Sequence, residues 1–397
     1  MEFSASEHPH IRYNPLKGEW VLVSPHRLQR PWQGQQESVP DEVPEFDPKN
    51  PLCPGVTRAN GEVTPQYEST YVFTNDFPAL LPQAPSPPDN SDPLFKMGDA
   101  KGTCLVMCFN PKSNVTVGTM EIPSLIDVVE RWIQELIKLG EKYLWVQIFE
   151  NRGAMMGCSN PHPHCQIWAT SFFPNEPRIK DCYQREYFQK YGRPLLMDYV
   201  RKELDLKERI VFQNDNWVVL VPFWAIWPYE TMILPLTHVR RMYDLNKTQI
   251  SDLADAMKRL STRYDNMFKV TFPYSMGWHG APTGALRNEP MDHWVFHGMY
   301  YPPLVRSATV KKFMVGYEML AQSQRDITPE KAADVLRNLG ESHFFLELKM
   351  QKEKVIPSKK KKPVTSEKPS KSTAGDKGQK GADKGDSKSP KNVKAPK

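Results

Sequence analysis

The sequence is poor in cysteine and has no long apolar run. Its 397 residues include only six cysteines, none of them in a Cys-x-x-Cys pair. No apolar stretch reaches the roughly 18 residues that a membrane-spanning helix needs. The amino terminus has neither a basic start nor an apolar segment, so we expect no secretory signal. Because free thiols are typical of a reducing compartment, we expect a cytoplasmic protein with no membrane association.

An excess of basic residues is also absent from most of the chain, although the net charge of the whole chain is +6. Residues 355–397 hold 13 Lys against four Asp or Glu, so the rest of the chain carries a net charge of about −3. The charge therefore argues against nucleic-acid binding by the folded part. The tail is built from Lys, Ser, Gly, Pro and Ala and has too few apolar residues to fold. We predict a disordered tail over 351–397, with a localisation signal or polyanion patch at 359–362 as the alternative.

The remaining residues predict an α+β fold with an internal duplication. Hydrophobic residues make up 39% of the chain and include ten Trp, enough for a packed core. An order of two strands, a helix and two strands occurs twice, and each unit ends in a His-bearing strand. The predicted elements are strands at 71–74, 103–109 and 144–149 with a helix at 122–143, then strands at 216–222, 231–235, 274–279 and 293–297 with a helix at 247–267. We predict two pseudo-repeated modules, 1–178 and 179–350, on a mixed, mainly antiparallel sheet shaped as a half-barrel.

The most informative segment is 160–168, Asn-Pro-His-Pro-His-Cys-Gln-Ile-Trp. Its two prolines disfavour a helix. In an extended segment His162, His164 and Gln166 would share one face. A neutral imidazole is a competent nucleophile toward phosphorus, and Ser159 with nearby backbone N–H groups could bind phosphate oxygens. The segment therefore predicts chemistry on an anionic substrate such as a phosphate, with a buried structural histidine as the alternative.

These residues and several further segments resemble the galactose-1-phosphate uridylyltransferase family, a branch of the histidine-triad superfamily. The likeness covers about residues 8–345. The other matching segments are Phe149–Asn160, Arg27–Trp32, Thr74–Leu80, Val221–Ala225, Gly277–Pro282 and Arg306–Met319. The resemblance implies histidine-triad-like modules and the exchange of UMP between UDP-glucose and galactose 1-phosphate, which yields glucose 1-phosphate and UDP-galactose. It also implies a double displacement through a uridylylated His164.

The resemblance also assigns roles to the surrounding residues. It places Ser159 and Gln166 beside the phosphoryl group, where a neutral Gln can donate an N–H without supplying a catalytic proton. It implies a homodimer whose active sites are completed by the neighbouring subunit, with Arg27 and Arg30 reaching the partner's substrate. The remaining implied substrate contacts are Arg58, Ala59, Asn75, Asp76, Asn151, Lys312, Phe313, Val315, Tyr317, Glu318 and Gln324.

Metal binding is where the sequence departs from the family. Bacterial members have one site with a Cys-x-x-Cys pair and two histidines, and another with a glutamate and three histidines. Asn50 and Ser113 replace ligands of the first site, which leaves Cys53 and His162. Lys180 and Met299 replace ligands of the second site, which leaves His279 and His297, with Asp181 or His293 as conceivable substitutes. Two ligands do not close a tetrahedral zinc site. We expect no cofactor requirement, while a structural zinc remains an open alternative.

Two other functions stay open from the sequence alone. A nucleotide phosphorylase or an adenylyl-sulfate transferase of the same superfamily would use a similar fold with another acceptor. A nucleotide sensor that has lost catalysis would account for the missing metal ligands, but the intact His164 and Gln166 argue against it.

Overall fold

A computed structural model describes residues 2–29, 43–89, 92–158, 160–307, 310–312 and 314–355. Met1–Glu353 form one compact unit, and the second unit, Lys354–Lys397, lies almost wholly outside the described residues. Helix α7 spans Phe344–Val355, so the first five residues of the predicted tail are helical. Over the ranges that the structure covers, no helix combines the length and apolar character needed to cross a membrane.

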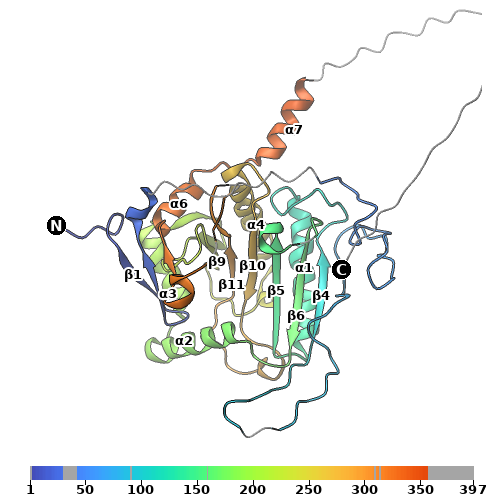
Figure 1. Ribbon diagram of the computed structural model, residues 1–397, viewed down its shortest axis with the longest axis horizontal. Helices are drawn as coiled ribbons and strands as arrows, with labels where there is room; N and C mark the ends of the chain where they lie inside the picture. The colour runs from blue at the N-terminus through green and yellow to red at the C-terminus, as the bar shows by residue number, and fades with distance from the viewer. Residues whose placement is uncertain are drawn as a thin grey trace, which may run out of the picture. The chain divides into compact units, whose positions relative to one another are not determined.

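A nine-stranded sheet forms the centre of the compact unit (Figure 1). All its ladders are antiparallel, and it ends at β3 and β7, so it does not close into a barrel. Its strands, in spatial order, are β3 (Tyr71–Thr74), β4 (Gly102–Cys108), β6 (His164–Thr170), β5 (Trp145–Arg152), β10 (Tyr274–His279), β11 (His297–Tyr301), β9 (Thr231–Pro235), β8 (Trp217–Leu220) and β7 (Ile210–Gln213).

The two halves of the sheet have the same strand order when each is read from its outer strand toward the middle of the sheet, as in a duplicated unit. The first half runs β3-β4-β6-β5 and the second runs β10-β11-β9-β8, so each strand of one half has a counterpart in the other. In each half one long helix, α1 (Ile122–Gly140) or α4 (Lys247–Phe268), connects the second strand to the third in chain order. The pair β5–β10 joins the halves. This order confirms the α+β fold with two pseudo-repeated modules, while the boundary at residue 178 stays a prediction.

One face of the sheet is covered by α1 and α4. Apolar residues of α1 recur at helical spacing, and Leu125, Val129 and Trp132 are almost fully buried. A proline in the first turn suits the start of this helix because its missing N–H has no helical acceptor there. These side chains share one core with Leu253 and Leu260 of α4. The large apolar core therefore lies on this face, under both modules.

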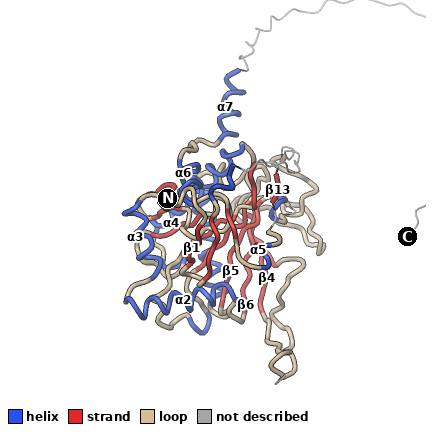
Figure 2. The backbone as a smooth tube through the Cα atoms, turned by 60° about the vertical axis from the view of Figure 1, so that its left-hand side comes forward, coloured by secondary structure: helices blue, strands red, loops and turns tan. Residues whose placement is uncertain are grey.

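The opposite face differs between the modules. Over the second module it is covered by α2 (Asn175–Tyr191) and α3 (Leu195–Leu206), and Leu196 of α3 packs in one cluster with Met232 and Met299. Figure 2 shows α2 and α3 at the side of the view away from β4 and β6. The break between α2 and α3 falls at Gly192, whose left-handed φ of 68° is typical of the residue that ends a helix. Over the first module the same face carries partly exposed polar residues.

Two small sheets and several short elements complete the compact unit. Strand β14 pairs with β2 in parallel in the small sheet β1-β2-β14. The nine-stranded sheet, for which the sequence predicts a mixed, mainly antiparallel arrangement, has only antiparallel ladders among the described strands. The elements are β1 (His10–Asn14), β2 (Glu19–Val23), β12 (Leu304–Ser307), β13 (Val310–Lys312), β14 (Gln324–Arg325), α5 (Tyr317–Leu320), α6 (Pro329–Arg337) and the 3-10 turns η1 (Pro25–Gln29), η2 (Ala154–Met156), η3 (Met242–Asp244) and η4 (Gly284–Leu286).

Two predicted strands differ from the structure by three residues or more at one end. The segment predicted as a strand at 293–297 is a turn that leads into β11, because the Trp294 N–H donates to the Met291 carbonyl at 3.0 Å. Strand β5 continues three residues past the predicted end at 149, because Asn151 and Arg152 pair with Ser275 and Tyr274 of the other module. The first difference arises from a local turn bond, and the second arises from pairing with a strand that is distant in sequence.

A buried group of charged residues connects β5, β10 and α4. The Arg152 guanidinium lies 2.7 Å from an Asp265 carboxylate oxygen and donates to Ser261 Oγ at 2.9 Å. The Tyr274 hydroxyl donates to Glu150 at 3.1 Å. Burial raises the pKa of Glu150 to about 7, although the nearby Arg152 opposes the shift. Glu150 is therefore partly protonated near neutral pH.

The raised pKa of Glu150 predicts a pH-dependent stability. The folded-state pKa lies above the ordinary value of 4.5, so the stability that the protonated form contributes is fully present below pH 4.5 and is lost as the pH rises through about 7. Relative to Glu150→Gln, the unfolding free energy of the unmodified protein should fall by about 3 kcal/mol across this range. Urea unfolding at a series of pH values measures it. The exposed Glu130→Gln is the control, and parallel curves for Glu150→Gln and the unmodified protein would contradict the assignment.

Candidate active site

Strand β6 places His164 and Gln166 on the open face of the first module. Cys165 and Ile167 are almost fully buried and point toward α1, where the Trp132 Nε1–H donates to Cys165 Sγ at 3.2 Å. Side chains alternate along a strand, so His164 and Gln166 face the other way and are partly exposed. The structure therefore brings these two predicted residues together on one face.

The His164 ring is fixed by a backbone carbonyl. Its Nδ1 lies 2.7 Å from the His162 carbonyl oxygen. A carbonyl oxygen can only accept a hydrogen bond, so Nδ1 carries the proton and Nε2 keeps its lone pair. Burial lowers the pKa of His164, so the ring stays neutral near neutral pH. A neutral ring with a free Nε2 is the state that a nucleophile needs.

Two amide side chains beside His164 have their orientations fixed by donors. The Trp168 Nε1–H donates to Gln166 Oε1 at 2.9 Å, and the Ser275 hydroxyl donates to Asn151 Oδ1 at 2.7 Å. With each amide oxygen engaged, the NH2 groups of Gln166 and Asn151 are left to donate to a substrate. The roles of Trp168 and Ser275 were missed in the sequence. The pairing of Ser275 with Asn151 comes from the other module, so no local signal predicts it.

His162 lies two residues before the start of β6 and is only 1% exposed. The Tyr67 hydroxyl donates to the Leu52 carbonyl at 2.8 Å, so it accepts from His162 Nε2–H at 2.8 Å. The His162 Nδ1 then accepts from Ser113 Oγ–H at 2.8 Å, and the Cys53 thiol lies 3.1 Å from the same Ser113 oxygen. Burial lowers the pKa of His162 to about 4. His162 is thus a neutral support whose carbonyl holds the His164 ring.

The residues present at the first metal position do not fit zinc. Both ring nitrogens of His162 are engaged by protein hydroxyl groups, so neither offers a lone pair to a metal. Asn50 exchanges two amide hydrogen bonds with Asn160, at 2.8 and 2.9 Å. In the described part of the chain, no group of three or more His, Cys, Asp or Glu side chains is arranged to hold a metal ion.

The second metal position does not fit either. Lys180 Nζ lies 3.1 Å from His297 Nε2, where a carboxylate ligand would be needed. The substitutes considered from the sequence are already bonded to each other, with Asp181 Oδ1 2.7 Å from His293 Nε2. Asp181 also accepts from Trp294 Nε1–H at 2.6 Å.

The residues predicted at the uridine and ribose end lie around an ion pair. The Arg58 guanidinium donates to Asp76 at 2.9 Å and lies over the Phe73 ring, 4.2 Å from its centroid. Ala59 is exposed, and the Asn75 side chain accepts from the Phe77 N–H at 2.9 Å. Phe73 pairs with Val106, which pairs with Gln166, so the Phe73 ring that lies under Arg58 shares a face of the sheet with the Gln166 amide.

The residues predicted to border the hexose form a second group. Arg27 Nη1 lies 3.5 Å from Gln324 Oε1, and Glu318 lies 3.6 Å from Arg325. Val315 and Tyr317 are exposed. None of the hydrogen bonds or ion pairs described for Arg27 reaches the β5–β6 face. Lys312 ends β13, and the predicted residues outside the described ranges are Arg30, Ser159 and Phe313.

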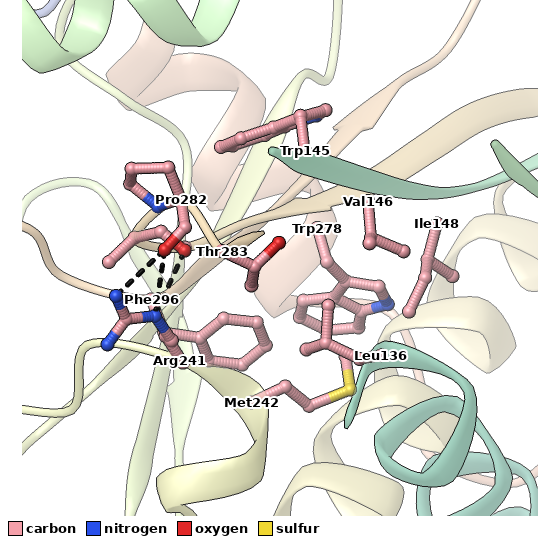
Figure 3. A pocket seen from close by; sticks show the side chains of 12 residues that line it. Leu136, Trp145, Val146, Ile148, Arg241, Met242, Trp278, Pro282, Thr283 and Phe296 are labelled. Carbon is pink, nitrogen blue, oxygen red and sulfur yellow. Dashed lines mark hydrogen bonds between the residues drawn. The ribbon is translucent and has the colours of Figure 1, made fainter. Parts of the chain in front are cut away.

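A small cavity near the far end of β5 is separate from this site. It has a volume of about 30 Å³ and is lined by Trp145, Trp278 and Arg241 among others (Figure 3), which leaves room for about one water molecule. The Arg241 guanidinium donates to the carbonyls of Ala281 and Pro282. The Arg241 N–H groups are thus engaged by backbone carbonyls of the fold, and no predicted site residue lines the cavity.

The support of His162 by Tyr67 predicts a stability effect. Tyr67→Phe removes the only described acceptor of His162 Nε2–H and leaves a buried donor unpaired, which should cost about 1–3 kcal/mol of unfolding free energy. Urea unfolding measures the change. Tyr71→Phe, which removes a hydroxyl from the ring stacked on Tyr67, is the matched control and should cost less. Equal losses in the two variants would show that the hydroxyl bond to His162 contributes nothing.

The sequence patterns of one protein family cover nearly all of the folded chain. The pattern described as galactose-1-phosphate uridyl transferase, N-terminal domain, matches residues 1–174. The pattern for the C-terminal domain of the same family matches residues 180–348. Together they match well over half of the chain.

Individual relatives point the same way. A probable galactose-1-phosphate uridylyltransferase of Drosophila melanogaster is 58% identical over 348 residues, covering 87% of this chain and 99% of the relative. The galactose-1-phosphate uridylyltransferase of Rattus norvegicus is 57% identical and covers 87% of this chain and 91% of its own. A solved uridylyltransferase structure has a TM-score of 0.65 at 27% identity, covering 82% of this chain and 97% of that chain. The chain therefore belongs to the galactose-1-phosphate uridylyltransferase family.

Proposed function

We propose that this enzyme transfers UMP from UDP-glucose to galactose 1-phosphate by way of a covalent uridylyl-His164. The observation that carries the proposal is the His164 ring, held by a 2.7 Å bond from Nδ1 to the His162 carbonyl. This bond leaves Nε2 free on the open face, which also carries Gln166. Family membership supports the choice of substrates.

The two half-reactions use the same atoms in turn. Nε2 attacks the α-phosphorus of UDP-glucose, an N–P bond forms, and the P–O bond to the β-phosphate breaks as glucose 1-phosphate leaves with the electron pair. The Nδ1–H stays on the ring, and its bond to the His162 carbonyl stabilises the positive charge on the substituted imidazole. A phosphate oxygen of galactose 1-phosphate then attacks the phosphorus, the N–P bond breaks, and UDP-galactose is released.

Gln166 suits a transferase better than a hydrolase. Its NH2 group can donate to a phosphoryl oxygen in both half-reactions, since its oxygen is already engaged by Trp168. An amide side chain neither gives a proton to a leaving group nor takes one from an attacking water molecule. The leaving group is itself a phosphate and needs little protonation, so the neutral side chain favours transfer to a second phosphate.

An exchange assay with matched variants tests this function. With UDP-glucose and galactose 1-phosphate, the protein should form equal amounts of UDP-galactose and glucose 1-phosphate. His164→Ala should lose at least about 10⁴-fold in rate, as expected for a covalent nucleophile, and imidazole should partly restore His164→Gly. The exposed His238→Ala is the control. Turnover of ADP-glucose with inorganic phosphate, in place of UDP-hexose exchange, would favour the phosphorylase alternative.

We also propose that the active unit is a homodimer with shared active sites. An apolar strip on β1 and β2 supports an interface there: Ile11, Tyr13 and Trp20 are 51%, 39% and 48% exposed, and the last two rings lie 5.1 Å apart. Exposed aromatic side chains of this kind are typical of subunit contacts. The separate hexose-side group around Arg27 and Gln324 suits a contribution to the partner's site.

Mixing two inactive variants tests the shared site. Arg27→Ala and His164→Ala should each be defective alone. In a mixed dimer, one of the two sites would combine an intact His164 with an intact Arg27, so mixing after subunit exchange should recover activity. No recovery, in samples that size-exclusion chromatography shows to be dimeric, would place Arg27 in its own chain's site.

Two further properties fit this proposal. All six cysteines are free thiols, which supports a reducing compartment such as the cytoplasm. Every chemical role in the two half-reactions falls to a side chain or backbone group, so we propose that no cofactor is required. The family patterns meet between residues 174 and 180, which supports a module boundary near 178.

A further inference from the structure

The second module carries a structural copy of the His164 site. In the first module Gln166 pairs with Phe149, and in the second Met299 pairs with Gly277. Two residues away on each strand, His164 corresponds to His297 and Asn151 corresponds to His279. The second module therefore repeats the histidine at the first position of its strand.

The copied histidine has the same backbone restraint. Nδ1 of His297 lies 2.8 Å from the Val295 carbonyl, two residues earlier in the chain, as Nδ1 of His164 lies 2.7 Å from the His162 carbonyl. By the same argument Nδ1 carries the proton, and Nε2 points onto the sheet face with a lone pair. His297 is therefore oriented as a nucleophile or a metal ligand would be.

A lysine from α2 lies against this copied site. Lys180 is 4% exposed, and its Nζ lies 3.1 Å from His297 Nε2 and 2.8 Å from Met299 Sδ. These are the counterparts of the two side chains that face the substrate in the first module. The ring of His279 lies 5.8 Å from that of His297, and His279 Nδ1 is buried with no hydrogen-bond partner in the described part of the chain.

A lysine amine and a metal ion are mutually exclusive at this position. Nζ donates a hydrogen to the His297 lone pair that a metal would use. A protonated Lys180 amine has no lone pair to offer a metal, and the Met299 thioether is not among the Cys, His and Asp/Glu ligands of structural zinc sites. Two imidazoles alone do not complete a tetrahedral site.

We propose that Lys180 closes the copied site: its amine takes the position that a phosphoryl group or a metal ion would occupy, and links α2 to β11 without any metal. The second module is then catalytically silent, and its stability is independent of divalent cations. Its role becomes structural, holding the sheet that the first module uses for catalysis.

The structural part is tested with a lysine of the same helix as control. Lys180→Met keeps the length of the side chain but removes the donor, so His297 Nε2 becomes a buried, unpaired acceptor. The melting temperature should fall by several degrees. Lys190→Met, at an exposed position of α2, should melt as the unmodified protein does. Equal melting temperatures for Lys180→Met and the unmodified protein would overturn the proposed link.

The metal part is tested with zinc alone as the probe. After incubation with zinc and dialysis, the unmodified protein should retain no zinc that depends on His279. Lys180→Glu places a carboxylate beside His279 and His297 and should gain about one equivalent of zinc and a zinc-dependent rise in melting temperature. The gain should vanish in Lys180→Glu combined with His279→Asn.

Each result of the zinc experiment bears on the proposal. Stoichiometric zinc in the unmodified protein that is lost on His279→Asn would overturn it. A folded Lys180→Glu protein that binds no zinc would show that Lys180 alone does not keep the metal out. If Lys180→Glu does not fold, the zinc content of the unmodified protein and the melting temperature of Lys180→Met still decide.

Discussion

The bond from His164 Nδ1 to the His162 carbonyl is the interaction on which the site depends. It sets the tautomer of the proposed nucleophile and leaves Nε2 free, and in the proposed mechanism it provides an acceptor for the N–H of the charged ring. The carbonyl stays in place because the His162 ring is bonded at both nitrogens, to Tyr67 and to Ser113. A chain of neutral hydrogen bonds thus performs the positioning that a metal-bound histidine would otherwise provide.

The duplicated architecture explains how one fold can contain both the proposed nucleophile His164 and its proposed silent counterpart His297. The two halves share strand order, helix placement and the Nδ1–carbonyl restraint. They differ in what covers the face of the sheet opposite α1 and α4. Over the second module α2 and α3 pack on this face, whereas over the first module His164 and Gln166 of β6 are partly exposed on it. Covering helices with apolar partners add core, and the open face keeps room for substrate. Under the two proposals, stability and chemistry are divided between two copies of one unit.

Much of the fold was predictable because its signals are local. Strands at 71–74, 231–235 and 274–279 agree with β3, β9 and β10 to the residue, and the helical period places α1 and α4. The turn before β11 was not predictable because a local bond from the Trp294 N–H to the Met291 carbonyl bends an otherwise strand-like apolar sequence. The extension of β5 was not predictable because it depends on pairing between modules. At the site, His164, Gln166 and Asn151 could be named from sequence. Tyr67 and Ser275 could not, because each acts through one hydrogen bond to a residue far away in the chain.

The most direct test of this account is the identity of the nitrogen that carries UMP. The protein is incubated with UDP-glucose alone, and the adduct is mapped to its residue by mass spectrometry. NMR of the ¹⁵N-histidine-labelled adduct, through its phosphorus–nitrogen coupling, then identifies the substituted ring atom. The account predicts UMP on Nε2 of His164, with Nδ1 still protonated. Substitution at Nδ1, an adduct on another residue, or turnover without any adduct would contradict it.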